Sequence, residues 1–195
     1  MAKLPKTRVI APPPAVLAAR AAASVLVTQD AVERAIDRQS VALTVELQDR
    51  NPFVLAVMHG GLPYAGALLR RFAFPCELGY VHVGRYGSAT QGGELVWHAT
   101  PSYALEGRTV LIVDDILDRG DTLTALTAWA ARSGAAEVLA TVLVDKQVSV
   151  SRSFSTRFAA LRCPDRYLFG CGMDFRGYWR NLPEIWALPR DFEDP

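Results

Sequence analysis

The chain has 195 residues, of which 50% are hydrophobic and 21% are charged, as in an ordinary globular domain. A net charge of +1 at pH 7 excludes a general electrostatic attraction to nucleic acid or acidic membranes, and no run of about 18 apolar residues is present that would predict a membrane span. The three cysteines show no CxxC spacing, which excludes a disulfide framework or zinc site as an interpretation and favours a reducing, cytoplasmic compartment.

The first 25 residues predict a flexible or loosely packed N-terminal extension. They contain basic residues among Ala and Pro but no Asp or Glu, which is faintly like a targeting peptide. Residues 12–14 are prolines, however, and no apolar core precedes a cleavage site. We therefore expect residues 26–195 to form a single domain.

Within that domain, helical and strand patterns alternate. We expect helices at about 31–48, 62–72 and 122–134, and strands at about 53–58, 79–84, 94–99, 109–113 and 137–146, followed by two short strands around 164–165. Apolar strands that alternate with helices predict an α/β fold, with a central, mainly parallel sheet flanked by helices. Ligands bind such sheets beyond the carboxyl ends of the strands.

The segment 110–122, "VLIVDDILDRGDT", places four aspartates at one such strand end. The start of the following helix offers free backbone N–H groups at Gly120, Asp121 and Thr122, which suit a phosphate. Asp114 and Asp115 suit a sugar diol or the water shell of Mg²⁺, and Asp118 lies between the two sites. The alternative is a solvated acidic loop in which Asp121 caps the helix.

The whole pattern resembles the phosphoribosyl-pyrophosphate (PRPP) binding motif of the type I phosphoribosyltransferases. The stretches "HGG", "RYGSATQGGEL", "VDK" and "PDRYLFGCGMDFRGYWRNLPEIW" are similar, in order and spacing, to the hypoxanthine-guanine phosphoribosyltransferases. This resemblance covers about 26–187. It implies a small base-binding hood formed by residues of about 156–190 with part of the N-terminal region.

The resemblance also implies a role for each matching residue. PRPP would be bound by Asp114, Asp115, Asp118, Arg119, Gly120, Asp121 and Thr122, and its pyrophosphate by His59, Gly60, Gly61 and Arg180. The base would be bound by Lys146, Tyr167 and Leu168, and Mg²⁺ by Asp114, Asp115 and Asp174. Arg85 and Tyr86 would belong to a mobile loop over the site.

The reaction implied is purine salvage, in which hypoxanthine or guanine and PRPP yield IMP or GMP and pyrophosphate. Asp118 would be the catalytic residue that handles the purine N7 proton. Lys146 would donate to the 6-oxygen of the purine. Adenine carries a donor at that position, and such a mismatch can cost a factor of about 10⁴.

Some positions depart from the commonest family pattern. His59 stands where a lysine is usual, Arg85 is an extra cation, and Arg119 and Asp121 flank Gly120 in place of more usual residues. A carboxylate beside a phosphate is repulsive, so we expect the Asp121 side chain to point outward and only its N–H to bind. Two alternatives stay open: a regulator that senses PRPP or nucleotides on the same fold, and a transferase for xanthine or another base. The family generally forms dimers or tetramers.

Overall fold

A mainly parallel sheet forms the centre of the computed structural model, which describes residues 10–85, 95–99 and 103–192. Within these residues the sheet has six strands in the order β4-β3-β2-β5-β6-β7. The strands are β2 (Phe53–Met58), β3 (Glu77–Arg85), β4 (Leu95–Ala99), β5 (Thr109–Leu117), β6 (Glu137–Gln147) and β7 (Phe158–Pro164). Only β4 is antiparallel to its neighbour among these described strands. The predicted α/β fold is confirmed.

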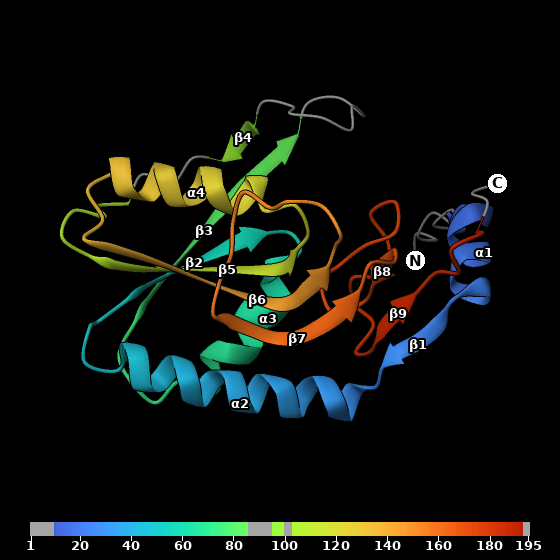
Figure 1. Cartoon of the computed structure of the whole chain (residues 1–195), viewed down its shortest axis with the longest axis horizontal. Helices are drawn as coiled ribbons and strands as arrows, with labels where there is room; N and C mark the ends of the chain where they lie inside the picture. Colours follow the sequence, from blue (N-terminus) through green and yellow to red (C-terminus); the bar gives the residue numbers. More distant parts are fainter. Residues whose placement is uncertain (1–9, 86–94, 100–102, 193–195) are drawn as a thin grey trace, which may run out of the picture.

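Helices cover both faces of this sheet (Figure 1). They are α2 (Gln29–Leu47) and α3 (Gly61–Leu69) on one face, and α4 (Asp121–Arg132) on the other. Strand side chains alternate between faces, so Leu111 and Val113 of β5 join the core under α2 and α3, whereas Val110 and Ile112 join the core under α4. In the described part of the chain, no helix is both long and apolar enough to cross a bilayer.

A second, smaller sheet lies beyond the carboxyl ends of the central strands (Figure 1). In the described residues it has three strands in the order β1-β9-β8. We call this sheet, together with the helix α1, the hood; its elements are α1 (Pro14–Ala22), β1 (Ser24–Val27), β8 (Leu168–Phe169) and β9 (Ile185–Ala187). The hood therefore joins the two ends of the chain above the strand ends where ligands are expected.

The expected loose N-terminal extension is wrong for residues 14–22. Val16 and Ala19 are fully buried in a cluster with Phe169 and Phe175, and Trp179 Nε1 donates a hydrogen bond to the Val16 carbonyl oxygen at 2.9 Å. The helix depends on partners about 150 residues away in the sequence, so its packing was not visible in the local pattern.

The expected hood segment, 156–190, is also divided differently. Residues 158–164 form β7, which pairs in parallel with β6 in the central sheet, for example Val144 with Leu161. A short apolar stretch such as residues 158–164 does not specify which sheet the strand joins, because the pairing is decided by contacts with residues distant in the sequence.

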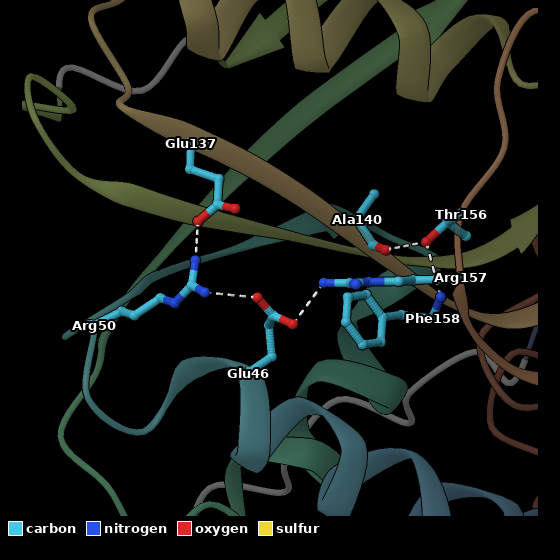
Figure 2. A network of polar contacts seen from close by, with 7 residues as sticks. All are labelled: Glu46, Arg50, Glu137, Ala140, Thr156, Arg157 and Phe158. Carbon is cyan, nitrogen blue, oxygen red and sulfur yellow. Dashed lines mark hydrogen bonds and ion pairs between the residues drawn. The ribbon is translucent and has the colours of Figure 1, made fainter.

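Ion pairs fix the end of α2 against the strands (Figure 2). Glu46 lies between Arg50, at 2.8 Å, and Arg157, at 2.5 Å, and Arg50 also pairs with Glu137 at the start of β6. Exposed pairs of this kind contribute little to stability. Their main effect is to set the position of the helix relative to β6 and β7.

The packing of α1 leads to a stability prediction. Val16→Ala should lower the free energy of unfolding by about 1–3 kcal/mol, because it leaves a cavity at a fully buried site. Leu17→Ala is the matched control, since Leu17 is 49% exposed, and it should change stability by no more than about 0.5 kcal/mol. Urea unfolding measures both. Equal effects would show that α1 does not pack as described.

Candidate active site

The turn between β2 and α3 packs directly against β5. It consists of His59, which is exposed, and Gly60 and Gly61, which are buried; the peptide bond before His59 is cis. A Cβ on Gly60 would overlap the Asp115 carboxylate, and one on Gly61 would overlap the Val113 carbonyl oxygen. Only glycine permits so close an approach, and the turn leaves its backbone near the acidic end of β5.

Asp114 and Asp115 lie within β5 and not in the loop that was expected to begin at residue 114, because the strand continues to Leu117. Asp114 is buried, and the Asp115 N–H donates to Asp114 Oδ1 at 3.0 Å. Burial, and then the charge of Asp115, raise the pKa of Asp114 well above its usual range. Burial also raises the pKa of Asp115. A bound proton or cation would neutralise the negative charge of this pair.

Arg180 lies in the connection between β8 and β9, residues 170–184, which we call the hood loop. It brings positive charge to the two acids and opposes the rise in their pKa values. Its Nη2 lies 2.5 Å from Asp174 Oδ1, and its Nη1 donates to the Gly172 carbonyl oxygen at 2.6 Å. A Cβ on Gly172 would in turn overlap the Gly60 carbonyl oxygen. The hood loop and the turn after β2 are therefore in direct contact.

Lys146 of β6 contacts the turns that follow β5 and β7 at the carboxyl end of the sheet. It lies near the end of β6, with Nζ 3.2 Å from Asp118 Oδ2 and 3.0 Å from Asp165 Oδ1. Its side chain is only 14% exposed, so the two carboxylates hold the ammonium in place. The sequence did not indicate Asp165 as a site residue, although the turn at 164–165 was predicted.

A cleft of about 210 Å³ opens beside this pair. Its lining residues are Asp115, Ile116, Asp118, Lys146, Arg166, Tyr167, Leu168, Met173 and Asp174. The Tyr167 hydroxyl donates to the Asp174 carbonyl oxygen at 3.1 Å, and the ring stays half exposed; Leu168 is buried at the start of β8. Ile116, Arg166 and Met173 were missed. Ile116 was the most predictable of the three, because it lies between Asp115 and Asp118 in the motif found in the sequence.

The predicted phosphate loop leads into α4. Gly120 has φ 92°, a left-handed conformation that favours glycine, and α4 begins at Asp121. Arg119 is exposed and Thr122 is half-buried. The first N–H groups of a helix lack partners within that helix, so this turn can bind an anion. Asp121 is exposed, and its Oδ1 accepts a hydrogen bond from Ser153 at 3.1 Å.

All three histidines of the chain lie in a row beside the turn after β2. The ring centroids of His59 and His82 are 4.5 Å apart, and those of His82 and His98 are 4.7 Å apart. Burial, and then the two neighbouring rings, lower the pKa of His82. This row was not predicted. Arg85 ends β3, and Tyr86 lies outside the described residues, so their mobile-loop role stays a prediction.

Comparison with known proteins supports the resemblance seen in the motifs. Residues 23–173 match the family model described as the phosphoribosyl transferase domain. The chain belongs to the phosphoribosyltransferase family. The hypoxanthine-guanine phosphoribosyltransferase of Bacillus subtilis is 29% identical over 84% of this chain and 92% of its own.

Two further similarities extend this phosphoribosyltransferase comparison. The bifunctional protein TilS/HprT of Listeria innocua is 32% identical over 84% of this chain, which spans only 26% of the length of that protein. A solved structure of a hypoxanthine-guanine-xanthine phosphoribosyltransferase has a TM-score of 0.76 and 27% identity, with 86% of this chain and 97% of the other covered.

Phosphoribosyltransferases of this type use a divalent metal. Among the described residues, no group of three or more His, Cys, Asp or Glu side chains could hold a metal ion without other ligands. A hard cation can also take one or two carboxylates and complete its shell with water and substrate oxygens, so the metal-binding roles expected of Asp114, Asp115 and Asp174 stay a prediction. The raised pKa values of Asp114 and Asp115 agree with a site that binds a cation together with its substrate.

The buried acid pair leads to a prediction about pH. It concerns the free energy of unfolding of this phosphoribosyltransferase when no metal is bound. Because burial raises the pKa of Asp114 in the folded state, its contribution to stability is fully present below the unfolded value of about 3.9. That contribution is lost as pH rises through the folded pKa. The contribution of Asp114 to the free energy of unfolding should therefore fall as pH rises from about 4 toward neutrality, and Asp114→Asn should remove this fall from the pH profile.

Urea unfolding in EDTA, at a series of pH values, measures the effect. The slope that Asp114→Asn removes should not exceed about 1.4 kcal/mol per pH unit, the limit for one group. Asp49→Asn is the control, because Asp49 is an exposed carboxyl outside the acid pair. Parallel profiles for wild type and Asp114→Asn would contradict the prediction.

Proposed function

We propose that this phosphoribosyltransferase acts in purine salvage, transferring the phosphoribosyl group of PRPP to hypoxanthine or guanine. The products would be IMP or GMP and pyrophosphate. The observation that carries the proposal is the Lys146–Asp118 pair, which places a hydrogen-bond donor beside an acceptor, 3.2 Å apart, at a cleft lined by Tyr167. The curated relatives named above add support.

The base would be read by this pair. A 6-oxopurine presents its 6-oxygen and N7 side by side on one edge, so Lys146 would donate to the oxygen while Asp118 faces N7. Tyr167 would stack on the purine, and Leu168 would contact it through its backbone. Adenine would leave the Lys146 ammonium facing a donor, a mismatch that is penalised strongly in a partly buried site.

PRPP would extend from this cleft across the strand ends. Its 5-phosphate would bind the N–H groups of Gly120, Asp121 and Thr122, with Arg119 beside them. Asp114 and Asp115 would accept from the ribose hydroxyls. The pyrophosphate would bind at the turn after β2, in contact with His59, Gly60, Gly61 and Arg180. Arg85 and Tyr86 belong to the segment that we expect to close over the site.

We infer that the divalent metal is Mg²⁺, because carboxylates and phosphate oxygens are its preferred ligands. Asp114 and Asp115 would hold one ion through water or the ribose, and Asp174 a second. When bound, the metal neutralises charge on the departing pyrophosphate.

Asp118 would handle the proton of the reaction. The bond from C1′ to pyrophosphate breaks while the purine N9 bonds to C1′, and positive charge develops on the sugar. The base must lose one proton in this exchange, and Asp118 would accept it at N7. Arg180 would stabilise the pyrophosphate that leaves.

The compartment and assembly remain part of the same proposal. All three cysteines of the chain lie in its described part and are free thiols, which suits a reducing cytoplasm. We expect a homodimer or homotetramer and no nucleic-acid partner.

A transferase that also accepts xanthine is the second candidate, because the solved hypoxanthine-guanine-xanthine phosphoribosyltransferase shares 27% identity with this chain. Incubation with PRPP, Mg²⁺ and each nucleobase separates the candidates. Monophosphate formed from hypoxanthine or guanine supports the proposal, and product from xanthine widens it. No product with any base would favour a regulator that only senses PRPP.

The role of Asp118 yields a prediction. Asp118→Asn should lower kcat by about 10²–10⁴-fold, because the amide cannot accept the proton, while the affinity for PRPP stays within a few-fold. Asp165→Asn is the matched control: it removes the other carboxylate beside Lys146 and should reduce kcat far less. Steady-state kinetics and PRPP titration measure both. Unchanged turnover in Asp118→Asn would refute the assigned role.

A further inference from the structure

The segment 148–157, between β6 and β7, lies against the predicted phosphate loop. Its far end is held by Thr156, whose Oγ1 donates to the Ala140 carbonyl oxygen at 2.5 Å and accepts from the Phe158 N–H at 3.0 Å (Figure 2). Nearer β6, Arg152 forms an ion pair with Asp145. The segment is thus held at two points, and Ser153 is the first of the three residues between these anchors.

Ser153 makes a set of contacts to the loop and to the first turn of α4. Its N–H lies 3.3 Å from the Arg119 carbonyl oxygen. Its Oγ lies 3.1 Å from Asp121 Oδ1 and 3.3 Å from the same carbonyl oxygen. Thr124 Oγ1 is 3.2 Å from both the Ser153 carbonyl oxygen and Ser153 Oγ.

The Ser153 hydroxyl has two acceptors within reach, and only one of them can take its hydrogen. A serine hydroxyl has one hydrogen to donate, and the Arg119 carbonyl oxygen already accepts from the Ser153 N–H. A carboxylate is also the stronger acceptor, since its bond is charge-assisted. The Ser153 hydroxyl therefore donates to Asp121. The single hydrogen of the Thr124 hydroxyl goes to the carbonyl oxygen or to the hydroxyl oxygen of Ser153.

The neighbouring residue of the segment covers the loop itself. A Cβ on Gly120 would lie 2.7 Å from Phe154 Cβ and 3.0 Å from Phe154 N. Gly120 is thus required twice, by its left-handed φ of 92° and by this contact. The position of segment 148–157 and the shape of the loop depend on each other.

Asp121 poses an electrostatic problem that this contact addresses. As the first residue of α4, its carboxylate is favoured by the helix dipole, but it lies next to the N–H groups where a 5-phosphate would bind. Like charges at such range repel. A carboxylate anchored on segment 148–157 is less able to turn toward the bound phosphate.

We propose that Ser153 is a positioning residue for PRPP binding, which holds the Asp121 carboxylate on segment 148–157 and so keeps the phosphate loop open to the 5-phosphate. This inference rests on the proposed function, since it concerns the same PRPP site. It assigns a role to a segment outside every motif found in the sequence.

Ser153→Ala tests the inference. Loss of one charge-assisted hydrogen bond should raise the Kd for PRPP, measured by calorimetry with Mg²⁺, and the KM for PRPP by about 3–10-fold, with kcat within twofold. Ser153→Thr, which keeps the hydroxyl, should restore the affinity. Ser151→Ala is the matched control, because Ser151 is an exposed serine of the same segment, and it should match wild type.

Asp121→Asn separates positioning from mere support of the loop. In the Asp121→Asn background, which lacks the repulsive charge, Ser153→Ala should raise the Kd by less than twofold. An equal loss in both backgrounds would overturn the proposal, as would unchanged affinity in Ser153→Ala. Wild-type protein that binds PRPP but forms no nucleotide would refute the transferase activity alone, and wild-type protein that does not bind PRPP would refute both.

Discussion

The buried pair of carboxyl groups at the end of β5 is the constraint on which the site depends. β5 lies in the middle of the central sheet and is packed on both faces, so its side chains deliver Asp114 and Asp115 to a place with little water. Burial raises the pKa of both acids. Such a pair is costly unless a proton, a cation or a hydrogen-bonding ligand relieves it, and the surrounding residues are arranged to admit these.

The hood completes the site because it contacts the central sheet at a few close points. The Gly172–Gly60 approach joins the hood loop to the turn after β2, and Arg180 reaches across toward the acids. Lys146 links β6 to both carboxylates of the neighbouring turns. Because the Tyr167 hydroxyl and the Asp174 carbonyl oxygen are hydrogen-bonded to each other, a change in the hood would be expected to move the cleft lined by Tyr167 together with the turn after β2.

Much of the central fold could be predicted from local pattern. The continuous apolar runs of β2, β5 and β6 indicated buried parallel strands, and the cluster of acids in residues 114–121 indicated where the candidate site lies. The boundary of β5 could not be predicted, because an acidic residue reads as the end of a strand unless its partners are known. The burial of α1 was missed for a similar reason: the residues that cover Val16 come from the opposite end of the chain.

The sequence by itself determined which chemical groups are present and in what order: the acids of residues 114–121, the glycines that permit close approach, and the lysine and tyrosine expected at the base. Only the tertiary structure decided which of them meet. It placed Asp118 beside Lys146, made a row of three histidines, and set Ser153 against Asp121. Local propensity acts over a few residues, whereas these contacts join residues tens of positions apart through the packing of the sheet and its connections.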